Sequence, residues 1–169
     1  MTPTRRGMIG ALAASGASLA GGALAAPAAL DPASVKKETD VACLYHCDFG
    51  DAHRFSAMLQ NMNNHYSAYG FDSFRLKLVI VAHSAGIKFF LDDLAGTPWE
   101  NDLIDPELYK RVAAVAGYGA EVYLCQMTYQ RLKIDPAKTR TDAFLKLVPS
   151  GVAAVAELQS KGFAYLKVG

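Results

Sequence analysis

The chain has 169 residues, of which 17 are basic, 16 are acidic and 51% are apolar. This length suits one domain, and the apolar share is sufficient for a hydrophobic core. Without the two N-terminal arginines the formal charge is −1, with 15 basic and 16 acidic residues. That balance argues against nucleic acid or an anionic membrane as a partner.

The first 26 residues have the pattern of an export signal. Arg5 and Arg6 precede a run rich in Ala, Gly, Ser and Leu, and a small-residue A-x-A cleavage site follows at 23–25. The paired arginines and the weakly apolar run resemble a twin-arginine signal, and the run is too polar for a convincing membrane-spanning helix. We therefore predict a twin-arginine signal over 1–26, a periplasmic protein, and no membrane association after cleavage.

The first half of the chain alternates between strand and helix patterns. Residues 27–38 are polar and carry prolines without periodicity, which predicts a linker before a single domain over 39–169. A short apolar run at 39–46 predicts a buried strand. Apolar residues spaced by three and four predict a helix over 52–69, and 74–82 reads as a central parallel strand.

The second half continues the alternation. After a short helix over 87–94 and a loop over 95–105, the pattern predicts a helix from Pro106 to Gly117 and a strand at 121–124. The remaining elements are a helical segment to 132, a strand at 143–148, a helix to 161 and a last strand at 163–168. Strands alternating with helices predict an α/β fold, a three-layer sandwich with a mainly parallel sheet of about five strands.

Polar side chains follow three of the predicted strands. His46 comes at the end of the first, His83 and Ser84 after the second, and Cys125 after the third. In an open α/β sheet the functional groups gather at the carboxyl ends of the strands. Cys125 also stands just before a helical segment, where free N–H groups and the helix dipole favour a thiolate. It is therefore our candidate reactive residue; the alternative is a small, buried and inert side chain.

A competing motif is the sequence A-H-S-A-G at residues 82–86. Between a strand and a helix it resembles the nucleophile elbow of the α/β-hydrolases, in which Ser84 would be the nucleophile. That family places its catalytic histidine after the serine, and no histidine follows Ser84 in this chain. The alternative is an ordinary turn in which the serine and the glycine satisfy the backbone.

The other cysteines offer soft-metal ligand types. Cys43 and Cys47 bracket His46, and His53 lies nearby. Four residues along a strand separate the two sulfur-bearing positions by about 13 Å, too far for one ion or for a disulfide. We expect no metal and no cofactor, and three cysteines leave at least one free thiol in an oxidising compartment.

Several stretches, in order along 41–168, are similar to the DsrE/DsrF-like family. They are Tyr45-His46 with Asp48, Asn61 and Asn64 in the first helix, Leu78–Gly86, Glu121–Cys125, Val148–Gly151 and Leu158–Tyr165. The resemblance implies a small flavodoxin-like layered fold that assembles into homo-oligomers, commonly trimers or hexamers. It also implies that a cysteine at the Cys125 position carries sulfur as a persulfide in the sulfur-relay members, and that His83 approaches this cysteine.

Two main functional hypotheses follow. In the first, the protein relays sulfane sulfur between a donor and an acceptor protein, with Cys125 as nucleophile and carrier and His83 as a hydrogen-bonding or proton-transfer partner. In the second, it is a non-catalytic oligomeric module that binds a small ligand at the strand ends, near His46 and Ser84. A serine hydrolase acting through Ser84 is a distant third.

Overall fold

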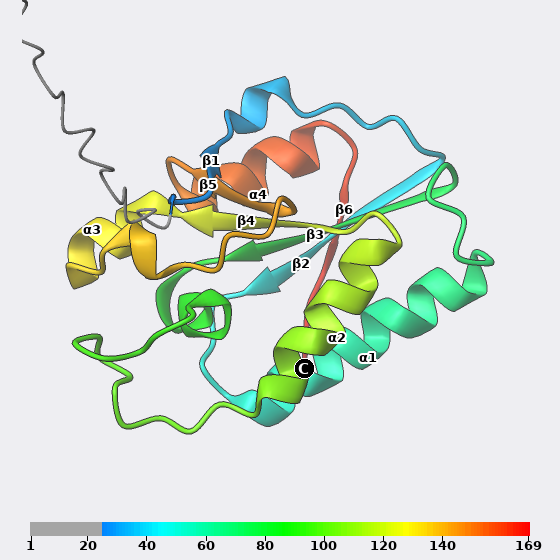
Figure 1. The fold of residues 1–169 in the computed structure, drawn as a ribbon. Helices are drawn as coiled ribbons and strands as arrows, with labels where there is room; N and C mark the ends of the chain where they lie inside the picture. The colour runs from blue at the N-terminus through cyan, green and yellow to red at the C-terminus, as the bar shows by residue number, and fades with distance from the viewer. Residues whose placement is uncertain (1–24) are drawn as a thin grey trace, which may run out of the picture.

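The computed structural model describes residues 25–169, so the predicted signal lies almost entirely outside the described residues. The core is one six-stranded sheet whose neighbouring strands are all parallel, in the order β1-β5-β4-β3-β2-β6 (Figure 1). The strands are β1 (Ala28–Ala29), β2 (Val41–Cys47), β3 (Leu76–Ala82), β4 (Glu121–Cys125), β5 (Leu145–Val148) and β6 (Ala164–Leu166).

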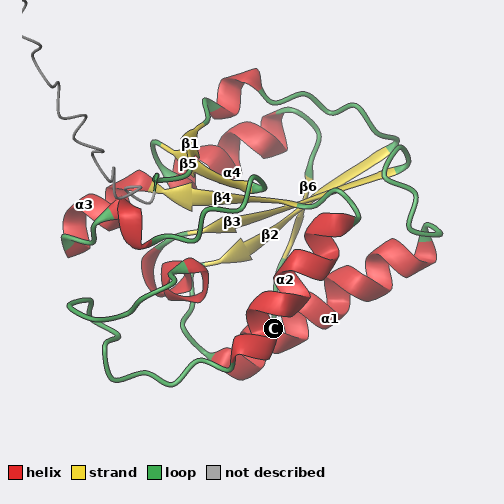
Figure 2. Ribbon diagram, viewed as in Figure 1, coloured by secondary structure: helices red, strands yellow, loops and turns green. Residues whose placement is uncertain are grey.

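Helices lie on both faces of the sheet, which confirms the predicted three-layer α/β sandwich (Figure 2). One face is covered by α1 (Ala52–Ala68) and α2 (Pro106–Gly117), and the opposite face by α4 (Gly151–Ser160). The short α3 (Gln126–Leu132) continues directly from the end of β4. Among the helices of residues 25–169, none has the length and apolar character that crossing a membrane requires.

The side-chain alternation of β2 shows why two apolar cores form. Cys43, Tyr45 and Cys47 point into the larger cluster under α1 and α2. Ala42 and Leu44 point to the other face and pack in the cluster that contains the α4 residues. Successive strand residues point to opposite faces, and a parallel sheet covered on both sides therefore needs a nearly continuous apolar sequence.

The ends of the helices follow from local chemistry. The side chain of Asp51 accepts a hydrogen bond from the backbone N–H of Arg54 at 2.6 Å and caps α1. Asp105 caps α2, whose first residue is Pro106, a position where a missing N–H costs nothing. Ser150 caps α4, and its side chain accepts from Ala153 N at 3.3 Å.

Two segments differ from the sequence expectation. Residues 27–38, expected to be a linker, contribute the edge strand β1, and Leu30 N donates to Leu147 O at 2.7 Å. This segment supplies the sixth strand of the sheet. The sequence did not predict it, because two residues without an alternating pattern give no signal of a strand. The predicted helix at 87–94 is instead a 3-10 segment, Ser84–Phe90.

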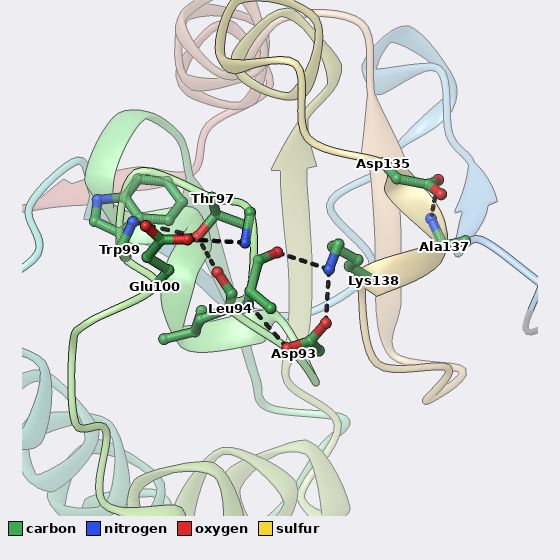
Figure 3. Close-up of polar contacts among 10 residues, drawn as sticks. Asp93, Leu94, Thr97, Trp99, Glu100, Asp135, Ala137 and Lys138 are labelled. Carbon is green, nitrogen blue, oxygen red and sulfur yellow. Dashed lines mark hydrogen bonds and ion pairs between the residues drawn. The ribbon is translucent and has the colours of Figure 1, made fainter.

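The loop after this 3-10 segment is held by polar contacts at its base (Figure 3). Thr97 donates from its hydroxyl to the Leu94 carbonyl at 2.7 Å, and the ammonium of Lys138 contacts Asp93 at 2.6 Å. A second ion pair, Lys88 with Asp102 at 2.6 Å, holds its far end. These contacts hold the loop against the 3-10 segments Ser84–Phe90 and Pro136–Lys138.

Candidate functional site

The carboxyl ends of β2, β3 and β4 meet at one edge, as the sequence predicted. Cys47 pairs in register with Ala82, and Ala82 with Leu124. His83 continues past the end of β3 and donates its backbone N–H to Cys47 O at 3.1 Å. His46 and Cys125, in the last residues of β2 and β4, and His83, just after β3, therefore lie at the same end of the sheet.

Four side chains at this edge form a continuous chain of hydrogen bonds. Nε2 of His46 lies 2.6 Å from Nε2 of His83. The Nδ1 atom of His46 lies 3.0 Å from the hydroxyl of Tyr165, and that of His83 lies 3.0 Å from Oγ of Ser84. The residues come from β2, β6 and the turn after β3. A neutral imidazole donates at one ring nitrogen and accepts at the other, so each histidine can link two partners in this chain.

Cys125 lies at the wall of an open cleft beside this chain of hydrogen bonds. The cleft has a volume of about 640 Å³, and His83, Thr128 and Arg131 line it together with Cys125. The cysteine side chain is only 5% exposed, yet it belongs to neither of the two apolar clusters. Cys125 is therefore a nearly fully buried side chain at the wall of the cleft.

Gly151 brings His83 and Cys125 together. A Cβ atom on residue 151 would lie 3.0 Å from Cβ of His83 and 3.1 Å from Cβ of Cys125. The first residue of α4 thus packs closely against both side chains, and an added methyl group would require them to move by a few tenths of an ångström. The two candidate residues are neighbours across this glycine.

The turn that follows β3 has a backbone conformation that few residue types can adopt. Ser84 has a φ of 50°, a left-handed conformation that is uncommon for a residue other than glycine. Its N–H donates to Oγ1 of the buried Thr128 at 3.0 Å. Two residues later, a Cβ on Gly86 would lie 2.1 Å from the carbonyl oxygen of Cys47, so only glycine fits. These contacts fix the direction of the His83 and Ser84 side chains.

The electrostatics favour a neutral His83. Burial lowers the pKa of His83 below its ordinary value, and the adjacent His46 acts in the same direction. Arg131 lowers the pKa as well, whereas the carboxylate of Asp48 raises it. A neutral imidazole can accept a proton or bind a cation, which a protonated ring cannot.

The other two cysteines have a different setting. Cys43 and Cys47 are free thiols on β2, as their strand spacing predicted. Both pack in the larger apolar cluster, and burial raises the pKa of each thiol. His53 is exposed on α1 and joins neither of them. These residues form no site, and Cys125 is the one cysteine that reaches the cleft.

The predicted residues His46, His83, Ser84 and Cys125 all lie at this edge. The structure adds four residues that the sequence analysis did not single out for chemistry: Thr128, Arg131, Gly151 and Tyr165. Only Gly151, in the P-S-G sequence before a helix, carried a local signal of a special position. Tyr165 is 119 residues from His46 in the chain, and no local pattern predicts that contact.

A second hollow of about 590 Å³ lies near the amino ends of the strands, beside Lys77, Glu121 and Lys146. Lys77 and Glu121 form an ion pair at 3.2 Å in this hollow. No cysteine or histidine lines it. The chemistry-bearing groups are at the opposite edge, and we place the candidate site there.

The layered parallel sheet and the cysteine-bearing cleft define the class of small α/β proteins with a site at the carboxyl edge. Residues 50–168 match the model of the DsrE/DsrF-like family, and the chain therefore belongs to this family. A solved structure of a protein of unknown function, MTH1491 from Methanobacterium thermoautotrophicum, has the same fold. It is 21% identical with a TM-score of 0.61, and the match covers 76% of this chain and 99% of that one. No curated protein matches the chain.

Proposed function

We propose that the protein carries sulfane sulfur as a persulfide on Cys125. The observation that carries this proposal is the position of Cys125: of the three cysteines in the sequence, it alone lines an open cleft. Cys43 and Cys47 are held in the apolar core as thiols by burial. Membership of the DsrE/DsrF-like family supports the same chemistry.

The reaction is an exchange between sulfur atoms. The thiolate of Cys125 attacks the terminal sulfur of a donor persulfide, R–S–SH, and the S–S bond of the donor breaks. The products are the Cys125 persulfide, which keeps the proton, and the donor thiolate R–S⁻. Electrons and atoms balance without an oxidant or reductant. Delivery to an acceptor thiolate is the same reaction in reverse.

The neighbours of Cys125 suit this exchange. Arg131 lines the same cleft and places a positive charge near an anionic sulfur. His83 and Cys125 both pack against Gly151, so an imidazole whose pKa is lowered by burial lies next to the cysteine. The exposed side chains of Met127 and Val152 stand at the cleft rim, where an apolar surface of a donor or acceptor protein would contact them.

Mass spectrometry tests the assignment. After treatment of the protein with a polysulfide donor, we expect a mass gain of about 32 Da, one sulfur atom, on the peptide that contains Cys125. The gain disappears in Cys125→Ser, while that variant keeps the wild-type unfolding curve. Sulfur on Cys43 or Cys47, or an equal gain in Cys125→Ser, would remove the basis of the proposal.

We further propose that the protein works in the periplasm as a homo-oligomer. The signal pattern of residues 1–26 supports export, and the exposed side chains of Phe74 (87%) and Leu103 (100%) offer apolar contacts between subunits. Replacing Arg5 and Arg6 together by lysine should leave the protein in the cytoplasmic fraction. Light scattering of the purified protein should give a trimer or hexamer; a monomer at micromolar concentration would contradict the assembly.

A second function is supported by the size of the cleft. A volume of about 640 Å³ exceeds the need of one sulfur atom and falls in the range of small-molecule sites. In that case the protein is a binding module, and its thiol is incidental. The two functions separate cleanly: a binding module keeps its ligand in Cys125→Ser, whereas a carrier loses its cargo.

A further inference from the structure

The imidazole rings of His46 and His83 face each other through their Nε2 atoms. Their Nε2 atoms are 2.6 Å apart, and each Nδ1 atom lies 3.0 Å from a hydroxyl, of Tyr165 and Ser84 respectively. Asp48 follows the same strand as His46, and its carboxylate lies within 4.8 Å of the imidazole nitrogens. Neither the fold comparison nor the proposed sulfur chemistry accounts for this arrangement.

We propose that His46, Asp48 and His83 bind a divalent first-row transition metal ion, of which Zn²⁺ is the representative. Two imidazoles and a carboxylate are a donor set typical of such ions, and three protein ligands leave one position open. The residues are partly or fully exposed, so an ion can reach them from solvent. This site goes beyond the sulfur carrier proposed above and does not include Cys125.

The hydroxyls on the outer ring nitrogens carry the argument. A histidine that binds a metal through Nε2 nearly always donates its Nδ1–H to an oxygen, which fixes the tautomer and the ring orientation. Tyr165 and Ser84 supply such an oxygen to both rings. With an ion bound, both Nε2 atoms are bare and both Nδ1–H groups donate outward. Without one, a single proton must be shared between two facing nitrogens.

The geometry needs only a small adjustment. Two nitrogens bound to one tetrahedral zinc at about 2.05 Å lie roughly 3.3 Å apart, so the 2.6 Å separation must open by roughly 0.7 Å. His46 sits near the end of β2 and His83 just beyond β3, where the strand pairing has ended. Rotation of partly exposed side chains at such positions can supply this movement without disturbing the sheet.

The ion would lie next to the sulfur cleft and share one residue with it. His83 lines the cleft through its side chain and offers Nε2 to the ion. Cys125 is not among the grouped ligand atoms, so its sulfur stays available for exchange. Residues 1–24 contain no His, Cys, Asp or Glu and therefore cannot supply a competing ligand of these types.

Titration of the purified full-length chain with Co²⁺ tests the proposal, because Co²⁺ replaces Zn²⁺ and reports its ligands in the visible spectrum. We expect saturation at one ion per chain, displacement by Zn²⁺, and no thiolate charge-transfer band. Binding should be lost in His46→Ala and in His83→Ala. It should persist in Cys125→Ser, which loses the persulfide, so that the two proposals fail separately. His53→Ala is the matched control, since His53 is exposed and outside the cluster.

Two milder variants guard against loss of folding. Tyr165→Phe removes only a hydroxyl and should weaken Co²⁺ binding by about 10- to 100-fold. Asp48→Asn keeps the side-chain shape and should weaken it as well. The proposal is overturned if the folded wild type binds no ion stoichiometrically, if binding survives both histidine substitutions, or if both milder variants bind as the wild type does.

Discussion

Gly151 lies directly against Cys125, and a Cβ on residue 151 would be 3.1 Å from Cβ of the cysteine. His83 is equally close to the same point, at 3.0 Å. Close packing, and not a left-handed φ, favours glycine at this position. The start of α4 forms one wall against which the two side chains are positioned.

The first prediction concerns this contact. Gly151→Ala should destabilise the fold by about 1–3 kcal/mol, since the added methyl group forces its neighbours apart. It should also change the rate at which iodoacetamide alkylates Cys125. Gly117→Ala is the control, because a Cβ there meets nothing within 4 Å. That variant should gain about 0.4–1 kcal/mol in urea unfolding. Identical curves and alkylation rates for Gly151→Ala and wild type would show that the contact is loose.

The second prediction concerns the turn that holds Ser84. Thr128→Val keeps the shape of the side chain but removes the oxygen that accepts the Ser84 N–H at 3.0 Å. Leaving this donor without a partner should cost about 1–3 kcal/mol in urea unfolding. Thr128→Ser keeps the oxygen and should recover most of the loss. Equal stability of the valine and serine variants would mean that the hydrogen bond contributes nothing.

The third prediction is the reactivity order of the thiols. Cys43 and Cys125 are exposed to nearly the same small extent, 4% and 5%, so exposure does not separate them. The surroundings of the two thiols differ. Cys43 is packed in the larger apolar cluster, and burial raises the pKa of its thiol, whereas Cys125 lines the cleft. Peptide mapping after brief alkylation of the folded protein should find the label on Cys125 first. Equal labelling of Cys43 would contradict the assignment of the cleft.

The fourth prediction is the dependence of stability on pH. Burial lowers the pKa of His65, which lies 3.2 Å from the Tyr45 hydroxyl, and also the pKa of His83. The unfolded chain then binds more protons than the folded one as the pH falls below about 6.5, the ordinary histidine value. The free energy of unfolding should therefore be constant above this pH and decrease below it. The slope cannot exceed about 1.4 kcal/mol per pH unit for each histidine.

Urea unfolding at a series of pH values between neutrality and mild acid measures this slope. His65→Gln should make the curve flatter by removing one of the two contributions. A stability that rises on acidification through this range would contradict the sign of both shifts.

The sequence was sufficient for most of the architecture. Apolar residues at spacings of three and four located α1 within a residue, and the run 74–82, alternating at first and then continuously apolar, identified a strand buried on both faces. Pro106 marked the start of α2 for a local reason, because a proline in the first turn needs no N–H partner, and the structure adds the cap by Asp105. The two-residue strand β1 is too short to show a period. The helix expected over 87–94 is a 3-10 segment that begins and ends earlier, at Ser84–Phe90.

The candidate site was predicted less completely. The rule that parallel strands present their carboxyl ends at one edge places His46, His83 and Cys125 together from the sequence alone. The rule could not predict the 2.6 Å distance between the imidazoles of His46 and His83. It also could not predict that His83 and Cys125 both pack against Gly151. The rule predicts which end of the sheet a residue occupies. A contact between two atoms depends also on the register of the strands and on the helix that packs against them.

The amino-acid sequence by itself determined the α/β class, the succession of strands and helices, and which residues end the strands, because each of these depends on chemistry within a few neighbouring positions. Only the tertiary structure decided which strands lie side by side. The last strand, β6, pairs with β2 at one side of the sheet. The preceding strand in the chain, β5, lies near the other side, between β1 and β4. That choice depends on packing over the whole molecule, and it brings Tyr165 to His46 across 119 residues of sequence.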